Sequence, residues 1–140
     1  HVVRASLGIL SELFRTCKRL GGVIAPTNCS RVLRTLDSLL RDGGQLLGDE
    51  DTRKSFLDCA ATVVSGFPSD YLLVAEIREK TCRLACRCVA EFCDLGRGLS
   101  AEGGPLATSE SVSGCAKVWE ALLDLSVGSL GTGGAETFRY

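Results

Sequence analysis

The spacing of hydrophobic residues predicts that the chain is helical over most of its length. Near the start of the chain, hydrophobic side chains recur at alternating steps of four and three, which lines up one face of an α-helix. The predicted helix runs from Val3 to Leu20 and ends at Gly21-Gly22, because glycine readily adopts the backbone that closes a helix. Its hydrophobic face consists of Val3, Leu7, Leu10, Phe14 and Cys17.

Two further helices are predicted, separated by residues that break helices. The second begins at an N-cap supplied by Asn28 or Ser30 and stops at Gly43-Gly44. The third opens with the acidic stretch 48–51, which suits the positive end of a helix dipole, and ends at residues 66–68, Gly-Phe-Pro. The predicted core faces are Val32, Leu33, Leu36, Leu39 and Leu40 in the second helix, and Phe56, Cys59, Ala60, Val63 and Val64 in the third.

A long fourth helix is predicted from a cap at Ser69 or Asp70 to about Leu95, and it carries two stripes. The first stripe comprises Val74, Ile77, Thr81, Leu84, Cys88, Phe92 and Leu95, and the second comprises Cys82, Cys86, Val89 and Cys93. At about 100° per residue, the two stripes point to well-separated sides of the helix. A helix that is hydrophobic on two sides is expected at the centre of a fold, with Val89 buried.

The remainder of the chain predicts a loop, a fifth helix and a tail. Residues 96–111 are rich in Gly, Ser, Thr and acidic residues, which is typical of a flexible exposed loop. Residues 112–126 form the fifth helix, and residues 135–140 alternate like the start of a strand. We therefore expect one helical domain over 1–134 and a tail over 135–140. The fifth helix is expected to bury Cys115, Trp119, Leu122 and Leu123.

The predicted fold class is all-α, because no run of alternating residues occurs before that tail. About five helices are expected, arranged either as an antiparallel bundle or as stacked helical hairpins. No sequence repeat is strong enough to identify a solenoid. The chain has 140 residues and lacks methionine, which leads us to expect a processed form or a fragment of a longer protein.

Cysteine is the most unusual part of the composition. The chain has eight cysteines. A large, even number of cysteines is typical of proteins in an oxidising compartment, where disulfides form. Four cysteines lie on the fourth helix and four on other elements, so we expect disulfides that join the fourth helix to its neighbours, including at least two of Cys82, Cys86 and Cys93. A local Cys17–Cys29 bridge and reduced cysteines packed in the core are the alternatives. The disulfide candidates are Cys17, Cys29, Cys59, Cys82, Cys86, Cys88, Cys93 and Cys115.

The chain lacks the residues that most catalytic and metal sites require. His1 is the only histidine, which excludes Ser-His and Cys-His nucleophilic sites. No CxxC pair exists, so a zinc site is not expected, and the glycine-rich stretches lack the context of a phosphate-binding loop. A net charge of -1 and the absence of a long apolar run argue against nucleic-acid binding and membrane insertion. We predict no enzymatic activity, no catalytic or metal-binding residue and no cofactor.

Two surface features are candidates for function. A basic flank on the fourth helix could form a patch with basic residues of the first helix, although charged residues on a solvated helix face are common. Asn28-Cys29-Ser30 matches an N-glycosylation acceptor, which matters only if the protein is secreted. The basic residues concerned are Arg78, Lys80, Arg83 and Arg87 on the fourth helix, and Arg4, Arg15, Lys18 and Arg19 on the first.

One segment resembles a known family. Residues 31–66, "RVLRTLDSLLRDGGQLLGDEDTRKSFLDCAATVVSG", resemble the paired helices in the REJ/GAIN region of polycystin-like and adhesion-receptor ectodomains. The closing sequence "VWEALLDLSVGSLGTGGAETFRY" is similar to their last helix leading into the first strand of a β-sandwich. The resemblance covers about half the chain and implies an extracellular helical module. It implies no catalytic residue, because the autoproteolytic site of these families is not in this chain, and the many cysteines of the fourth helix depart from the family.

Together these features predict a non-enzymatic extracellular or lumenal helical module for protein–protein interaction or structural scaffolding. The expected partner is another protein or another part of a larger assembly, and the expected location is extracellular or in the secretory pathway. The alternative is an intracellular, cytoplasmic armadillo/HEAT-like adaptor whose core cysteines are reduced. A carrier of an apolar ligand is a third class, and it would require a cavity.

Overall fold

The protein is all-helical, as predicted, in the part of the chain that the structure describes. The computed structural model describes residues 2–42, 47–92 and 109–129, and no strand occurs within these ranges. Within these ranges the predicted number of about five α-helices is confirmed, with one short 3₁₀ helix in addition. The elements are α1 (Val2–Arg19), α2 (Pro26–Asp42), α3 (Glu50–Ser65), the 3₁₀ helix η1 (Ser69–Leu73), α4 (Ala75–Phe92) and α5 (Ser109–Ser129).

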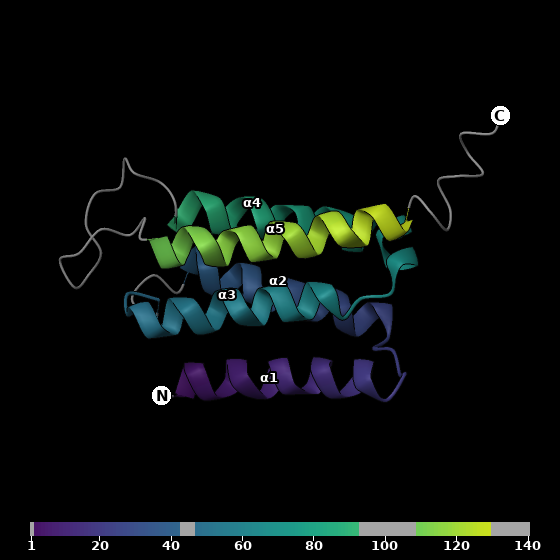
Figure 1. Cartoon of the computed structure of the whole chain (residues 1–140), viewed down its shortest axis with the longest axis horizontal. Coiled ribbons are helices and arrows are strands. Elements are labelled where there is room, and N and C mark those ends of the chain that lie inside the picture. The colour runs from purple at the N-terminus through teal and green to yellow at the C-terminus, as the bar shows by residue number, and fades with distance from the viewer. Residues whose placement is uncertain (1, 43–46, 93–108, 130–140) are drawn as a thin grey trace.

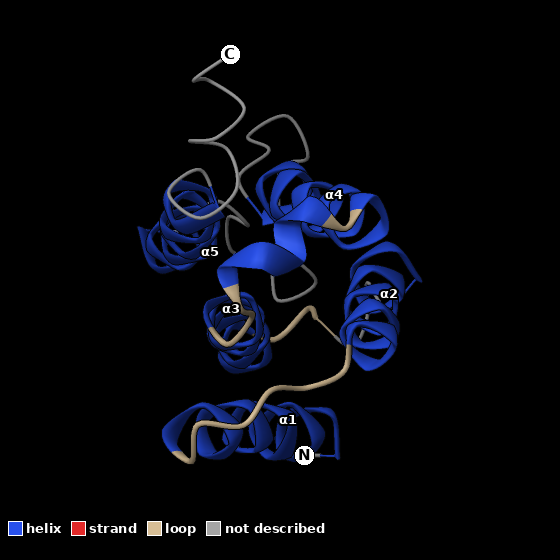
Figure 2. Ribbon diagram, turned by 90° about the vertical axis from the view of Figure 1, so that its right-hand side faces the viewer, coloured by secondary structure: helices blue, strands red, loops and turns tan. Residues whose placement is uncertain are grey.

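The helices form two rows (Figures 1 and 2). In the first row α3 packs between α1 and α5, and in the second row α2 packs beside α4. Contacts within each row join residues that are separated by similar distances along the sequence. In the first row, Lys18 Nζ donates to the carbonyl oxygen of Ser65, 47 residues later. In the second row, Asp37 pairs with Arg87, 50 residues later. The α1–α2 hairpin therefore recurs in space as the α3–α4 hairpin. The helices form an all-α bundle, as predicted, in which these contacts repeat from one pair of helices to the next.

The helix boundaries follow local chemistry, but the predicted starts of the second and fourth helices are wrong. The fourth helix was expected to begin at a cap supplied by Ser69 or Asp70, whereas these residues lie in η1, and α4 begins at Ala75 because the extended backbone of Val74 separates the two helices. Gly21 has a φ of 75°, so it adopts the left-handed conformation expected just after α1. Asp49 caps α3, since its carboxylate accepts hydrogen bonds from the backbone and hydroxyl of Thr52 at 3.1 and 2.8 Å. The predicted caps of the second helix are wrong because α2 already begins at Pro26, whose missing N–H costs nothing at a first helical position. Asn28 and Ser30 lie inside its first turns.

The central helix of the fold is α3 rather than α4. All five residues of its predicted core face are buried, and Phe56 has an exposed fraction of 0%. The Phe56 ring packs edge-on against Phe92 of α4, with 6.1 Å between the ring centroids. This contact ties the two rows together, because α3 lies in the first row and α4 in the second.

The second stripe predicted on the fourth helix does not face the core. Residues of the first stripe from Ile77 to Phe92 are buried, but Val74 is exposed, and Leu95 lies outside the described residues. In the second stripe Cys82 and Cys86 are exposed, and Val89 is 38% exposed, so its predicted burial is wrong. The physical reason is position: α4 has α2 on one side and α5 on another, which leaves a third side in solvent.

α5 begins earlier than predicted and exposes part of the face that was expected to be buried. The helix starts at Ser109, so the last residues of the predicted 96–111 loop are helical. Cys115 and Leu122 are buried as predicted and Trp119 is half-buried, but Leu123 is 60% exposed, which contradicts the prediction. The predicted strand at 135–140 and the remainder of the loop lie outside the described residues.

Candidate interaction surfaces

The predicted disulfide cross-linking is not supported. The structure describes seven of the eight cysteines, and no disulfide joins any two of them; Cys93 lies outside the described residues. Cys82 and Cys86 point to solvent on α4, so the prediction that at least two cysteines of this stripe bond to other elements is wrong. Cys17 is half-buried, and the buried cysteines are Cys29, Cys59, Cys88 and Cys115.

The buried thiols behave as core side chains rather than as nucleophiles. The thiol of Cys29 donates to the carbonyl oxygen of Ile24 at 3.5 Å, and the hydroxyl of Tyr71 donates to the same oxygen at 2.7 Å. Burial raises the pKa of Cys29 to about 11, with a further contribution from neighbouring Cys17. Burial also raises the pKa of Cys59. Because the reactive species is the thiolate, the raised pKa lowers the reactivity expected of Cys29 and Cys59.

Thiol counting tests this description of the cysteines. In denaturant without reductant, at least seven cysteines per chain are expected to react with iodoacetamide. In the native protein Cys82 and Cys86 should react first, because they are exposed, and Cys29 slowest. Intact mass and peptide mapping measure both results. A lower total count that rises on reduction would show that the native protein contains disulfides.

The described residues offer little to a metal ion or a buried ligand. Among them, no group of three or more His, Cys, Asp or Glu side chains could hold a metal. Two hollows of about 490 and 500 Å³ lie at the surface: the first is lined by Lys18, Phe67 and Asp124 among others, and the second includes Arg31 and Glu76.

No described helix combines the length and apolar character required to span a lipid bilayer. The prediction of no catalysis and no cofactor stays a prediction.

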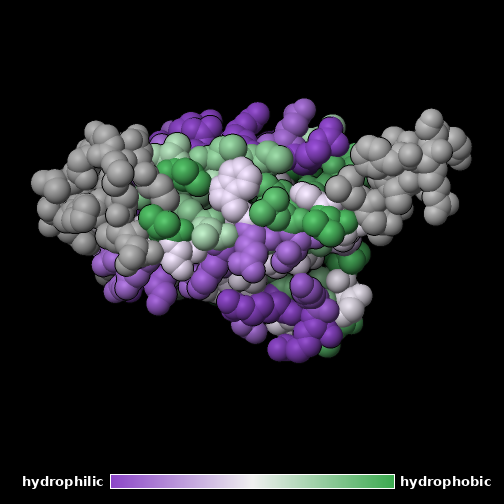
Figure 3. Space-filling model, turned by 45° about the horizontal axis from the view of Figure 1, so that its top comes forward, coloured by the Kyte–Doolittle hydropathy of each residue, from purple (hydrophilic) through white to green (hydrophobic). Residues whose placement is uncertain are grey.

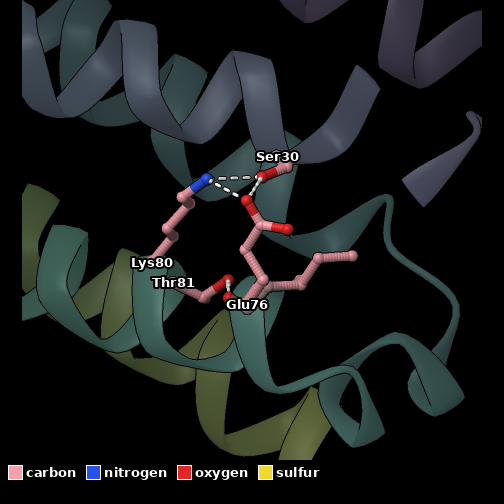
Figure 4. Close-up of polar contacts among 5 residues, drawn as sticks. Ser30, Glu76, Lys80 and Thr81 are labelled. Atoms are coloured by element: carbon pink, nitrogen blue, oxygen red, sulfur yellow. Dashed lines mark hydrogen bonds and ion pairs between the residues drawn. The ribbon is translucent and has the colours of Figure 1, made fainter. Parts of the chain in front are cut away.

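A polar network joins α2 to α4 near the start of both helices (Figure 4). The buried hydroxyl of Ser30 donates to Glu76 Oε1 at 3.0 Å, and Lys80 Nζ lies 2.6 Å from both oxygens. The hydrogen bond from Lys80, followed by that from Ser30, lowers the pKa of the Glu76 carboxyl. Glu76 is therefore ionised and engaged with Lys80, which lies one turn along the same helix.

A second ion pair lies further along the same two helices. Arg87 Nε lies 2.5 Å from Asp37 Oδ1, and both side chains are largely shielded from solvent. A cavity of about 100 Å³ next to this pair is lined by Asp37 and by the basic residues Arg34, Arg41, Lys80 and Arg83. We call this line of contact the α2–α4 seam, and we define its charged residues as Arg31, Arg34, Asp37 and Arg41 of α2 and Glu76, Lys80, Arg83 and Arg87 of α4.

The seam carries more positive charge than its own carboxylates neutralise. Asp37 and Glu76 are each engaged by a cation of α4. Within the described part of the chain, Arg31, Arg34 and Arg83 are exposed and form no ion pair. The sequence analysis missed Arg31 and Arg34 of α2, because it considered only the basic residues of the first and fourth helices. Their spacing along one helix was the signal that could have identified them.

The basic residues of the first helix do not join this surface. α1 and α4 lie far apart, at opposite sides of the fold (Figure 2). Arg4 and Lys18 contact α3 instead, through Asp51 and the carbonyl oxygen of Ser65. On α4, Arg78 bonds to the carbonyl oxygen of Leu72. The residues of both helices therefore do not form the common patch that was considered beside a solvated helix face, while Lys80, Arg83 and Arg87 do share one surface.

Hydrophobic side chains are exposed on both outer helices of the first row. On α5 the exposed hydrophobic residues are Val112, Leu123 and Val127, with Trp119 half-buried. Figure 3 shows apolar side chains gathered on one face of the molecule. On the outer side of α1 and just beyond it, the exposed hydrophobic residues are Val2, Ile9, Leu13 and Leu20. We call these sets the α5 stripe and the α1 stripe.

The candidate glycosylation site lies at the surface. Asn28 is exposed in the first turn of α2, and the two residues that complete the sequon, Cys29 and Ser30, are buried. Ser30 is also part of the network with Glu76 and Lys80. The glycosylation of Asn28 stays a prediction.

Comparison with known proteins identifies no relative: no family model, no curated protein and no solved structure matches this chain. The resemblance to the helical part of REJ/GAIN-type ectodomains stays a prediction.

Proposed function

We propose that the chain is a non-enzymatic protein-interaction module of stacked helical hairpins, of the armadillo/HEAT kind, that binds an acidic segment of a partner protein along the α2–α4 seam. The spatial repeat supports the comparison with such modules, since contacts between successive hairpins span 46 to 50 residues. Helical repeats of this kind have periods of about 40–47 residues. The comparison is one of architecture only and supports the general class rather than a partner.

The observation that carries the proposal is the set of three arginines without an ion-pair partner among the described residues of the seam. Guanidinium groups bind carboxylates through paired, charge-assisted hydrogen bonds. Arg34 lies between the cavity beside Asp37 and the hollow beside Glu76, since it lines both. An extended acidic segment lying along the seam would meet Arg31, Arg34 and Arg83 in turn. The chain as a whole has a net charge of -1, so the positive seam is a local feature.

The state of the cysteines supports a reducing compartment for this module. Four of the described cysteines are buried, and no disulfide joins those that the structure describes. A core that holds several thiols is stable where thiols remain reduced, which favours the cytoplasmic adaptor over the extracellular module. The extracellular module is the second candidate, and the exposed Asn28 of the sequon supports it.

Binding of an acidic peptide tests the proposed function. Fluorescence anisotropy with a labelled oligoglutamate should show binding that weakens as salt is added, because exposed charges are screened. Arg34→Glu with Arg83→Glu should weaken binding by about tenfold or more, since both changes place like charges against the peptide. Both arginines are exposed, so the double variant should keep the circular dichroism spectrum of the unmodified protein.

The matched control reverses two exposed charges elsewhere. Arg19→Glu with Lys54→Glu changes the net charge by the same amount, but these residues lie on α1 and α3, outside the seam. This control should bind the peptide as the unmodified protein does. Equal loss in the control, or no binding by the unmodified protein, would contradict the proposal. Tighter binding of a single-stranded RNA of equal charge would identify the seam as a nucleic-acid surface instead.

A further inference from the structure

From the two apolar stripes we infer that the chain associates head to tail with a second copy of itself, with the α1 stripe of one copy packed on the α5 stripe of the next. This inference is independent of the proposed function, because neither stripe includes a residue of the α2–α4 seam. It begins with the order of the first row, in which α3 is covered on both sides and α1 and α5 are the outer members.

The side chains on the two outer faces are of a kind that helices bury. Ile9 is 72% exposed and Val127 is 69% exposed, although large aliphatic residues each contribute about 1.5–3 kcal/mol when fully buried. Val2, Ile9 and Leu13 of the α1 stripe are separated by steps of seven and four, which places them on one side of the helix, and Leu20 follows its end. A contiguous apolar area such as that in Figure 3 is typical of an interaction surface.

The two stripes suit each other in charge as well as in apolar character. α1 carries four basic residues and one acidic residue, so its net charge is positive even though Arg4 and Lys18 contact α3 and Arg15 pairs with Glu12. α5 carries three acidic residues and one basic residue, so its net charge is negative. Two copies of α5 would repel each other, and so would two copies of α1. Complementary charge therefore favours α1 against α5 over either symmetric pairing.

The contact would also continue packing that the molecule already uses. Within one copy, α1 lies on α3 with Arg4 near Asp51 at one end and Lys18 bonded to Ser65 at the other. α3 in turn lies on α5. An α1 helix from a second copy, placed on α5, would extend the row α1–α3–α5 by one helix. Because the two surfaces differ, such a contact does not close on itself, and it would add copies in an open series.

Sedimentation equilibrium of the unmodified protein and two double variants tests this inference. The unmodified protein should increase in average mass with concentration, starting from 14.8 kDa for one copy. Ile9→Glu with Leu13→Glu disables the α1 stripe, and Leu123→Glu with Val127→Glu disables the α5 stripe. Each variant alone should remain at the mass of one copy, because it lacks one of the two surfaces. All four positions are exposed, so both variants should fold, which circular dichroism checks.

Mixing the two variants is the decisive step. Each contributes one intact stripe, so an equal mixture should form a dimer and grow no further. A mixture that stays at the mass of one copy would overturn the inference, as would an unmodified protein that remains monomeric at every concentration. Loss of association only in the α5 variant, with the α1 variant still dimeric, would show symmetric α5 pairing and would also overturn it. Oligoglutamate binding by both variants should match that of the unmodified protein.

Discussion

Replacing Phe56 with alanine is expected to lower the free energy of unfolding by about 3–5 kcal/mol, the range for an aromatic side chain removed from a packed core. Phe56 is fully buried on the central helix, and its ring contacts Phe92 across the two rows. Alanine would therefore leave a cavity at the point where the rows meet. Urea denaturation followed by circular dichroism measures the change.

The control for Phe56 is an aliphatic residue on the surface of the same row. Val127→Ala also removes hydrophobic atoms, but Val127 is mostly exposed, so the change in unfolding free energy should stay within about 0.5 kcal/mol. The control should be measured at a concentration where the chain is monomeric. A loss at Phe56 no larger than that at Val127 would mean that α3 is not at the centre of the fold.

Much of the helical framework could be predicted because its signals are local. The acidic start of α3, the glycine after α1 and the Gly-Phe-Pro end of α3 each act through neighbouring backbone groups, and all three are in the structure. The core face of α3 was also predictable, since five residues at helical spacing define one buried side. α2 was placed less well, because Pro26 and the residues after it fit two different starting positions.

The arrangement of the helices depended on contacts that no short stretch of sequence contains. Apolar spacing on α4 gave two stripes, but which one is buried depends on where α2 and α5 pack. The prediction treated the cysteines as partners in disulfides, whereas Cys88 and Cys115 are small residues of the core. The thiol of Cys115 donates to the carbonyl oxygen of Cys88. Leu123 was expected to be buried from its spacing on α5, but it is exposed because it lies on the outer side of the row.

The candidate surfaces were predictable only in part, for the same reason. Lys80, Arg83 and Arg87 were recognised as a basic flank, but their pairing with Asp37 and Glu76, and their approach to Arg34, require α2 beside α4. By charge alone, the basic residues of the first helix are equally suited to that patch. Their separation from it follows from the packing of α1 against α3.

Replacing Arg53 with methionine is expected to lower the free energy of unfolding by about 2–4 kcal/mol, because hydrogen bonds to a charged group are strong and buried carbonyls left without a donor are costly. Arg53 is 3% exposed, and its Nη1 donates to the carbonyl oxygens of Leu47 and Gly48 at 3.1 and 2.6 Å. These two residues are themselves buried just before α3. The arginine thus holds the entry to the central helix.

Methionine is chosen because it keeps an unbranched apolar chain in the same space while removing the donors. Lys54→Met is the matched control: it removes the same charge from the next residue of α3, but Lys54 is exposed, so its effect should remain within about 0.5 kcal/mol. Urea denaturation of both variants separates the loss of donors from the loss of charge. Equal effects at positions 53 and 54 would show that the carbonyls of Leu47 and Gly48 find other donors, and that Arg53 contributes only its charge.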